Sequence, residues 1–165
     1  MATAWLGLGS NVSADINIRA GIGELQATFG KVALSPVYGS KAVGFSGDDF
    51  INLAARVETA MSPLELRDYL HDLEDRHGRK RDVPKFSDRS LDIDILLYGN
   101  LELDTAELQL PRAEILSFAH VLRPLADLAP GLTYPGLTRT LGSLWLAMSE
   151  NAPDLVRLDD GPYRS

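Results

Sequence analysis

The chain has 165 residues, 45% of them apolar and 24% charged, which is ordinary for one globular domain with a sizeable core. The net charge of −7 disfavours general nucleic-acid binding, and the absence of cysteine excludes disulfides and thiolate metal sites. No apolar run is long enough for a bilayer, and the first residues lack the pattern of a signal peptide. We expect a single domain over residues 1–165 in a cytoplasmic protein that makes no membrane contact and is monomeric or weakly associating.

The first half of the chain predicts strands that alternate with a helix. Ala4 to Leu8 is a short apolar strand that ends in Gly9-Ser10-Asn11. Val32 to about Tyr38 and Phe50 to Thr59 have the pattern of two further strands, the latter with Phe50, Asn52 and Ala54 on one face. The helix between the first two strands ends at Gly30, and its apolar residues recur at helical spacing: Ile18, Ile22, Leu25 and Phe29.

A second helix begins at Ser62, whose hydroxyl can accept a capping hydrogen bond. Pro63 suits the first turn of that helix, and Glu65 completes a capping box. Its apolar stripe consists of Leu66, Tyr69, Leu70 and Leu73. An apolar strand follows after residue 90. Residues 114–128 and 141–148 predict further helices that pack outside the preceding unit, and the tail from about residue 151 is polar and expected to be poorly ordered.

This order of elements, β-α-β-β-α-β, is that of the ferredoxin-like fold. We therefore predict an α+β protein in which four strands form an antiparallel sheet with two helices on one face. Additional C-terminal helices lie outside that core.

Two carboxylates interrupt the apolar strand S-L-D-I-D-I-L-L-Y-G. Residues two apart in a strand point the same way, so Asp92 and Asp94 share one face with Cα atoms roughly 6.5–7 Å apart. Hard oxygen ligands at this spacing suit Mg²⁺ held together with substrate phosphates. The alternative is a pair of exposed acids that form ion pairs with Arg89 or Lys85. The opposite face carries the predicted core residues Leu91, Ile93, Ile95 and Leu97.

Two further features favour a ligand on the face of the acids. Residues 76–89 hold six Arg or Lys against two Asp, a local charge of +4 that suits phosphate, although it is equally compatible with a solvated charge run. Asn52 lies beside Phe50, and an amide next to an aromatic ring could recognise a flat hydrogen-bonding heterocycle. A surface asparagine is the simpler reading of Asn52.

Several common site patterns are missing from the sequence. It contains neither a Walker A loop nor a dinucleotide-binding glycine motif. His71, His77 and His120 are scattered, without the spacing of a histidine metal cluster.

Four segments together resemble the 6-hydroxymethyl-7,8-dihydropterin pyrophosphokinase family. They are G-L-G-S-N, F-I-N-L-A, E-D-R-H-G-R-K-R and D-R-S-L-D-I-D-I-L-L-Y-G, and the similarity runs from about residue 4 to residue 135. The last block is the most specific. The resemblance implies a ferredoxin-like core and transfer of pyrophosphate from ATP to the hydroxymethyl group of a reduced pterin, with two Mg²⁺ ions, in folate biosynthesis.

The resemblance also implies roles for individual residues. Asp92 and Asp94 match the pair that binds both metal ions, and Asn52 matches the asparagine that hydrogen-bonds the pterin. Arg79, Arg81 and Arg89 match basic residues that neutralise phosphate, and Glu74 matches an acid near the nucleotide. The remaining matches line the pterin pocket: Ser40, Val43, Phe50 and Phe86.

The resemblance changes after Pro111. Many members have P-H-x-x-x-x-x-R-x-F there, and this chain has P-R-A-E-I-L-S-F-A-H. Arg112 offers a charge for a nucleotide phosphate, and His120 offers a ring that can stack on the pterin. Phe118 cannot supply the charge of the arginine that it replaces, and Glu107 adds a negative charge near the nucleotide region.

The implied reaction is in-line attack of the pterin hydroxyl on the β-phosphorus of ATP, with AMP as the leaving group. Two alternatives remain: a paralogue that binds pterin or nucleotide without turnover, and a Mg²⁺-dependent kinase of a related heterocycle.

Overall fold

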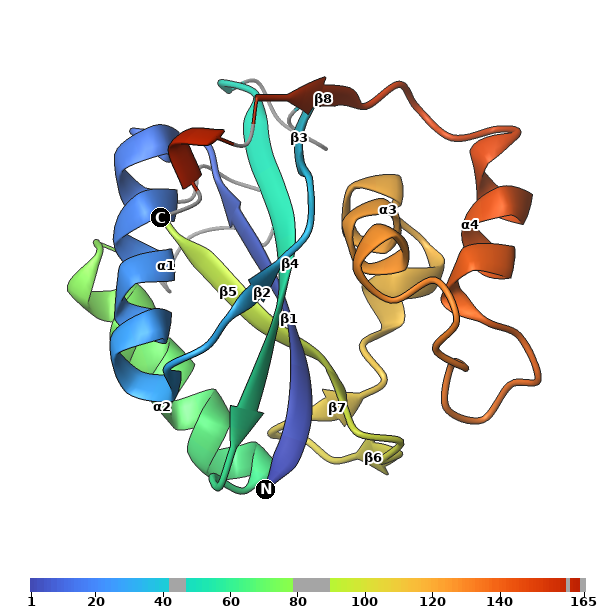
Figure 1. Ribbon diagram of the computed structural model, residues 1–165, viewed down its shortest axis with the longest axis horizontal. Helices are drawn as coiled ribbons and strands as arrows, with labels where there is room; N and C mark the ends of the chain where they lie inside the picture. Colours follow the sequence, from blue (N-terminus) through green and yellow to red (C-terminus); the bar gives the residue numbers. More distant parts are fainter. Residues whose placement is uncertain (42–46, 79–89, 160, 164–165) are drawn as a thin grey trace.

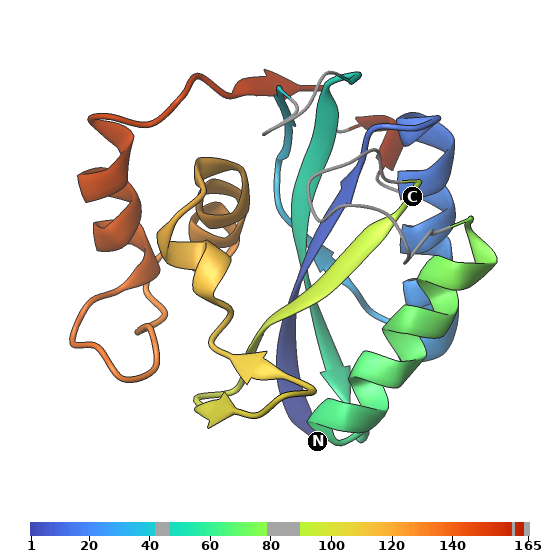
Figure 2. The same cartoon turned by 180° about the vertical axis from the view of Figure 1, so that it is seen from behind.

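The computed structural model describes residues 1–41, 47–78, 90–159 and 161–163. In this part of the chain a six-stranded sheet lies between helices (Figure 1). Helices α1 (Ala14–Phe29) and α2 (Pro63–Arg76) cover one face. Helix α3 (Ala119–Leu128) packs on the opposite face, and α4 (Leu141–Ser149) packs against α3, as the view from behind in Figure 2 also shows. None of the helices described is long and apolar enough to span a membrane.

The sheet has the strand order β5-β1-β4-β3-β8, and β2 pairs with β4 beside β3. All of these pairings are antiparallel, and the first four strands have the order of a ferredoxin-like sheet. The predicted α+β class is therefore confirmed. The bounds of the strands are β1 Ala2–Ser10, β2 Ala33–Leu34, β3 Val37–Ser40, β4 Phe50–Thr59, β5 Asp92–Tyr98 and β8 Val156–Leu158.

Short elements connect β5 to α3 and close the chain. β6 (Leu103–Asp104) and β7 (Gln109–Leu110) form a two-stranded sheet, and the 3₁₀ helix η1 (Ala113–Leu116) precedes α3. The helix predicted over 114–128 is thus two pieces, separated by an extended backbone at Phe118. A second 3₁₀ helix, η2 (Gly161–Tyr163), follows β8.

The strand predicted from Val32 to Tyr38 is divided into β2 and β3 at Ser35 and Pro36. The hydroxyl of Ser35 accepts a hydrogen bond from the backbone N–H of Ala54 at 2.8 Å, while the Ser35 N–H donates to the Ala54 carbonyl at 2.9 Å. Pro36 has no N–H to offer a ladder. The side chain of Ser35 therefore replaces one backbone partner where the strand is interrupted.

A β-bulge in β5 overturns the predicted position of one core residue. Trp5 pairs with Leu97 and Leu6 pairs with Ile95, so Leu96 is an extra residue on β5. Leu97 was predicted to face α1 and α2 with Ile95, but it packs with Trp5 in the cluster beneath α3. The same cluster shows that the second face of the sheet is partly covered by helix rather than open along its whole length.

The polar tail contributes two short elements, β8 and η2, to the described structure. β8 pairs with β3 in antiparallel register, and Tyr163 of η2 is buried against α1, with the Arg19 guanidinium 5.8 Å from its ring centroid. Burial and the neighbouring Asp15 raise the pKa of Tyr163 to about 12. Backbone pairing and one aromatic side chain therefore attach the described part of this segment to the sheet and to α1.

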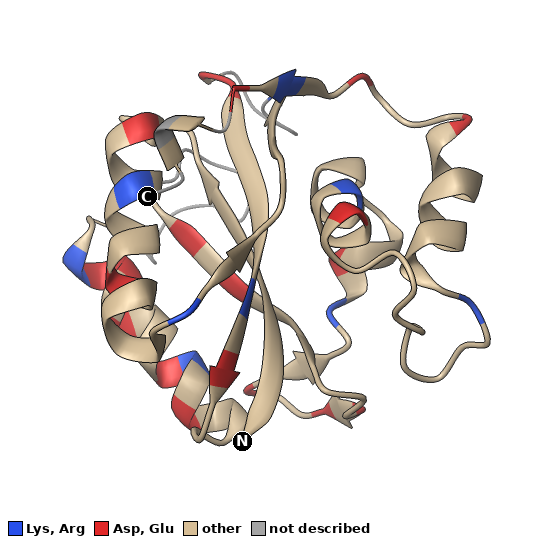
Figure 3. Ribbon diagram, in the orientation of Figure 1, with Lys and Arg blue, Asp and Glu red and all other residues tan. Residues whose placement is uncertain are grey.

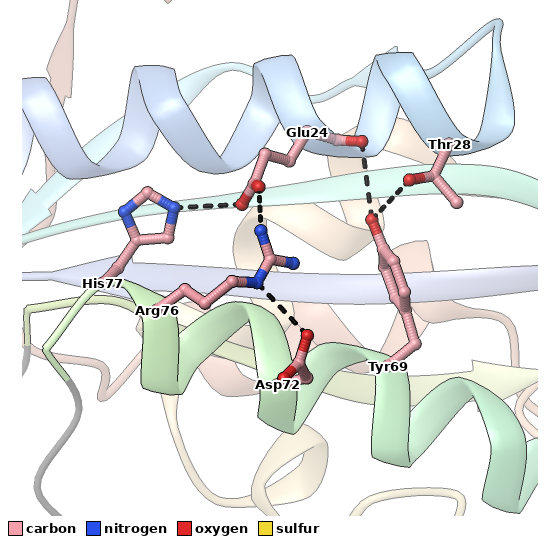
Figure 4. Close-up of polar contacts among 6 residues, drawn as sticks. All are labelled: Glu24, Thr28, Tyr69, Asp72, Arg76 and His77. Carbon is pink, nitrogen blue, oxygen red and sulfur yellow. Dashed lines mark hydrogen bonds and ion pairs between the residues drawn. The ribbon is translucent and has the colours of Figure 1, made fainter.

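A polar seam joins α1 to the C-terminal half of α2 (Figure 4). The Tyr69 hydroxyl is 2.7 Å from that of Thr28 and donates to the backbone carbonyl of Glu24. The Glu24 carboxylate pairs with Arg76 and, at 3.0 Å, with the His77 ring. These contacts hold the end of α2 in register with α1.

The capping box predicted for α2 is present. Ser62 accepts from the Glu65 N–H at 3.2 Å, and the Glu65 carboxylate accepts from the Ser62 N–H at 3.0 Å. We expect Ser62→Ala to lower the free energy of unfolding by about 1 kcal/mol, because one N–H of the first turn loses its acceptor. Urea denaturation measures this change.

Ser13 provides the matched control for this prediction, because it stands at the N-cap of α1 without a side-chain capping bond. Ser13→Ala should change the unfolding free energy by less than about 0.5 kcal/mol. Equal losses for the two variants would contradict the assigned role of the Ser62 hydroxyl.

Candidate active site

The two carboxylates of β5 project from the face of the sheet opposite α1 and α2. Asp92 pairs with Gly9 and Asp94 with Gly7, whereas Ile93 between them is buried in the α1–α2 core. Figure 3 shows these acidic positions along the strand. Both side chains are half-buried, and their nearest neighbours on β1 are residues without side chains. The two acids thus point away from the α1–α2 core, as the alternation of side chains along the strand predicted.

Gly9 is the centre of a row of residues that crosses three strands. It pairs with Asp92 on β5 and with Asn52 on β4. Directly paired residues of an antiparallel sheet project to the same face, so the side chains of Asp92 and Asn52 lie on either side of Gly9. The two residues are two strand spacings apart, which is about 9.5 Å. A Cβ on Gly9 would lie 3.5 Å from the Asn52 Oδ1 atom. Glycine leaves the floor between an acid and an amide without a side chain.

The Asn52 amide is buried, with 5% of its surface exposed, and is oriented by β3. Its Nδ2 donates to the Ser40 Oγ at 2.7 Å. Ser40 pairs with Phe50, so the hydroxyl, the amide and the aromatic ring lie together on this face. The arrangement brings together three residues predicted for the pterin pocket.

Beyond Asn52 the row continues on β3 with Tyr38, which is paired with Asn52 and is almost fully buried. Its hydroxyl donates to the carboxylate of Asp127, and the Arg123 guanidinium lies 4.7 Å from its ring centroid. Both partners belong to α3, so this helix covers the β3 side of the row.

Arg112 brings a positive charge to the acids of β5. Its Nη2 is 3.6 Å from the Asp94 Oδ1, and its Nε is 3.2 Å from the Glu114 Oε2. Burial lowers the pKa of Arg112, but the nearby carboxylates, foremost Asp94 and Glu114, more than offset burial and raise the pKa above its ordinary value. The guanidinium is therefore a permanent cation beside the acid pair.

His120 stands at the start of α3 and stacks on Phe118, with ring centroids 5.2 Å apart and planes inclined by 28°. Burial lowers the pKa of His120, and the negative charge of Asp92 only partly opposes this shift. The environment of His120 therefore favours the neutral imidazole. Its interaction with Asp92 locates the stacked rings at the acid end of the row, and sequence reasoning had not assigned Phe118 to the site.

Glu74 is buried in α2 and supports β5 from the core side. Its Oε2 accepts a hydrogen bond from the backbone N–H of Ile93 at 2.9 Å, between the two acids. Its charge also acts on Arg112. The position is next to the site, and the nucleotide role of Glu74 stays a prediction.

A cleft of about 240 Å³ lies along the edge of β5 that faces away from β1, between α2 and residues 105–109. The cleft shares Asp94 and Arg112 with the acid site, and Glu107, placed near the nucleotide by the sequence, is one of its lining residues. Sequence reasoning missed most of this lining, because it comes from three separate segments. The α2 side of the lining consists of Arg67, Leu70 and His71.

The remaining predicted site residues lie outside the described part of the chain: Val43, Arg79, Arg81, Phe86 and Arg89. Among the described residues, no group of three or more His, Asp or Glu side chains could hold a metal ion by itself. Two carboxylates suit an ion that completes its shell with ligand oxygens, as Mg²⁺ does with substrate phosphates.

The sequence is similar to a family model and to named bacterial proteins. Residues 5–130 match the family model described as 7,8-dihydro-6-hydroxymethylpterin-pyrophosphokinase. The 2-amino-4-hydroxy-6-hydroxymethyldihydropteridine pyrophosphokinase of Haemophilus influenzae is 36% identical over 141 residues, which cover 82% of this chain and 86% of that protein. The Pseudomonas aeruginosa protein of the same name is 43% identical over 105 residues, covering 63% of this chain and 64% of the relative.

Among solved structures, the wild-type HPPK-DHPS of Plasmodium falciparum with pteroate superposes with a TM-score of 0.74 over 94% of this chain. The identity is 13% and the present chain spans 47% of the Plasmodium chain, so this likeness concerns the fold of one part of it. Because the family model spans most of the sequence and the Haemophilus relative matches along nearly its full length, the chain belongs to the 7,8-dihydro-6-hydroxymethylpterin-pyrophosphokinase family.

Proposed function

We propose that this protein transfers pyrophosphate from ATP to 6-hydroxymethyl-7,8-dihydropterin in folate biosynthesis and releases AMP. The row Asp92–Gly9–Asn52 carries the proposal, because it joins a cation-binding end to a heterocycle-binding end across a floor without side chains. Sequence identity to pyrophosphokinases of this specificity supports the same substrates.

The pterin would bind at the Asn52 end of the row. The Asn52 Oδ1, which lies beside Gly9, offers an acceptor to the edge of a pterin ring, while Nδ2 donates to the Ser40 Oγ at 2.7 Å and so fixes the orientation of the amide. Phe50 and His120 offer aromatic faces for stacking. By resemblance to the family, Val43 and Phe86 complete the apolar walls of the pocket.

ATP would lie in the cleft along β5, with its phosphates at the end formed by Asp94 and Arg112. Leu70 gives the cleft an apolar wall for a base, and the Arg112 guanidinium has the fork geometry that suits phosphate oxygens. By resemblance, Glu74 lies near the nucleotide, while Arg79, Arg81 and Arg89 neutralise phosphate charge.

Asp92 and Asp94 would hold two Mg²⁺ ions, since both present hard carboxylate oxygens and Gly9, the partner of Asp92 on β1, has no side chain that would occupy the space of a ligand. When bound, Mg²⁺ neutralises phosphate charge and lowers the pKa of the attacking hydroxyl.

The residues of the chain then act mainly by positioning. Asn52 and its aromatic neighbours orient the hydroxymethyl oxygen toward the β-phosphorus. A bond forms between these two atoms while the bond from the β-phosphorus to the bridging oxygen of the α-phosphate breaks, and AMP leaves with that electron pair. The hydroxyl proton passes to solvent, and Arg112 stabilises charge on the phosphates.

The direct test mixes the purified protein with ATP, Mg²⁺ and 6-hydroxymethyl-7,8-dihydropterin and measures AMP. We expect AMP and the pterin diphosphate in equal amounts. Binding of both ligands without AMP would instead favour a non-catalytic paralogue. AMP release only with another hydroxylated heterocycle would favour a kinase of a related substrate.

Asp94→Asn removes a carboxylate charge with little change in shape. We expect kcat/KM for AMP release to fall at least about 100-fold, because the substitution weakens the metal site. The matched control is Asp104→Asn on β6, where the side chain is exposed and the rate should stay within about twofold. A transfer rate near that of the wild type for Asp94→Asn would refute the mechanism.

Asn52→Ala should weaken pterin binding about 10- to 100-fold, because a buried, oriented hydrogen-bonding group is lost, and leave the Kd for ATP unchanged. Isothermal titration calorimetry with each ligand separately measures both constants. Ser40→Ala, which removes only the group that orients the amide, should weaken pterin binding by a smaller factor. Loss of ATP affinity with intact pterin affinity would reverse the pocket assignment.

A further inference from the structure

We propose that Arg112 is a resident cation of the acid site which competes with divalent metal for Asp94, and that Glu114 is the positioning residue which draws Arg112 away. The inference rests on the proposed function, because it concerns the same metal site, and it assigns Glu114 a role that the family resemblance does not supply.

The guanidinium of Arg112 is shared between carboxylates on two different elements. Asp94 belongs to β5 and lies 3.6 Å from Nη2, beyond the range of a good hydrogen bond. Glu114 belongs to η1 and lies 3.2 Å from Nε, so it holds the closer contact. The three side chains are 25–33% exposed, which leaves their interactions only partly screened by water.

The backbone around Arg112 is fixed, so the choice between partners lies with the side chain. The Arg112 N–H donates to the Leu96 carbonyl at 3.0 Å, which attaches this segment to β5. The Arg112 carbonyl accepts from the N–H of Ile115, a residue with no exposed surface. Glu114 lies in the same turn of η1, so the backbone positions of Arg112 and Glu114 are fixed relative to each other.

The competition follows from Coulomb's law. A divalent cation on Asp94 repels the guanidinium, and each additional interaction of Arg112 with Asp94 reduces the negative charge that attracts the metal. Glu114 offers the guanidinium another carboxylate. Metal binding should therefore be accompanied by movement of Arg112 toward Glu114, and the charge of Glu114 should set how easily Asp94 is released.

The proposal gives two single substitutions opposite signs. Arg112→Gln removes the competitor and should tighten binding of Mn²⁺ to the nucleotide-free protein about fivefold. Glu114→Gln leaves Arg112 without its alternative partner and should weaken Mn²⁺ binding by a similar factor. Titration of Mn²⁺ alone, followed by the electron paramagnetic resonance signal of the free ion, measures these affinities without any turnover.

The double variant separates positioning from direct attraction between Glu114 and the metal. If Glu114 acts through Arg112, adding Glu114→Gln to Arg112→Gln changes the Mn²⁺ affinity by less than about twofold. An undiminished effect of Glu114→Gln in that background would overturn the proposal. Glu107→Gln, which removes one negative charge from the rim of the cleft, is the charge-matched control and should also stay within twofold.

Asp94→Asn distinguishes failure of this inference from failure of the proposed function. Loss of Mn²⁺ binding in Asp94→Asn, together with unchanged affinity in Arg112→Gln, would overturn the competition and retain the metal site. Unchanged Mn²⁺ binding in Asp94→Asn would overturn both. Circular dichroism checks the fold of each variant. If Arg112→Gln does not fold, the test is the comparison of Mn²⁺ affinity between Glu114→Gln, which should bind more weakly, and Glu107→Gln, which should not.

Discussion

The antiparallel pairing of β1 with β5 and β4 determines the geometry of the whole site. Its register sets Gly9 between Asp92 and Asn52 and sets Gly7 beside Asp94. A shift of one residue would turn the carboxylates toward α1 and α2 and the isoleucines toward the ligand face, because side chains alternate along a strand. The buried cluster on the α1–α2 side makes such a shift costly, so the hydrophobic core enforces the position of the polar groups.

Charge balance is the second constraint on this region. Asp92, Asp94, Glu74 and Glu114 all act on the guanidinium of Arg112, and their charges more than offset the effect of burial on its pKa. Acids gathered at this density need cations, and both the arginine and a divalent metal can provide them. The same cluster that prepares a phosphate site thus contains a protein cation of its own.

Helix α3 limits the ligand face and also contributes to it. Its contact with Tyr38 covers the β3 end of the row, and its first turn presents His120 and Phe118 near Asp92. The substitutions that distinguish this chain after Pro111 thus lie in one place, around the acid pair. A cationic side chain and two stacked rings occupy the positions where the family resemblance leads us to expect histidine, arginine and phenylalanine.

The local sequence pattern determined several elements of the fold and the direction of the two acids. Alternation of apolar and polar residues identified β4 and the outward direction of both acids, and capping chemistry identified the start of α2, because these depend on neighbours within a few residues. Tertiary structure decided the rest. Four features depend on contacts between segments that are distant in sequence. They are the β-bulge that moves Leu97 to the opposite face of the sheet, the pairing of β8 with β3, the cleft beside β5, and the sharing of Arg112 between Asp94 and Glu114. Such contacts depend on packing and register between elements, and no periodicity within a single element encodes them.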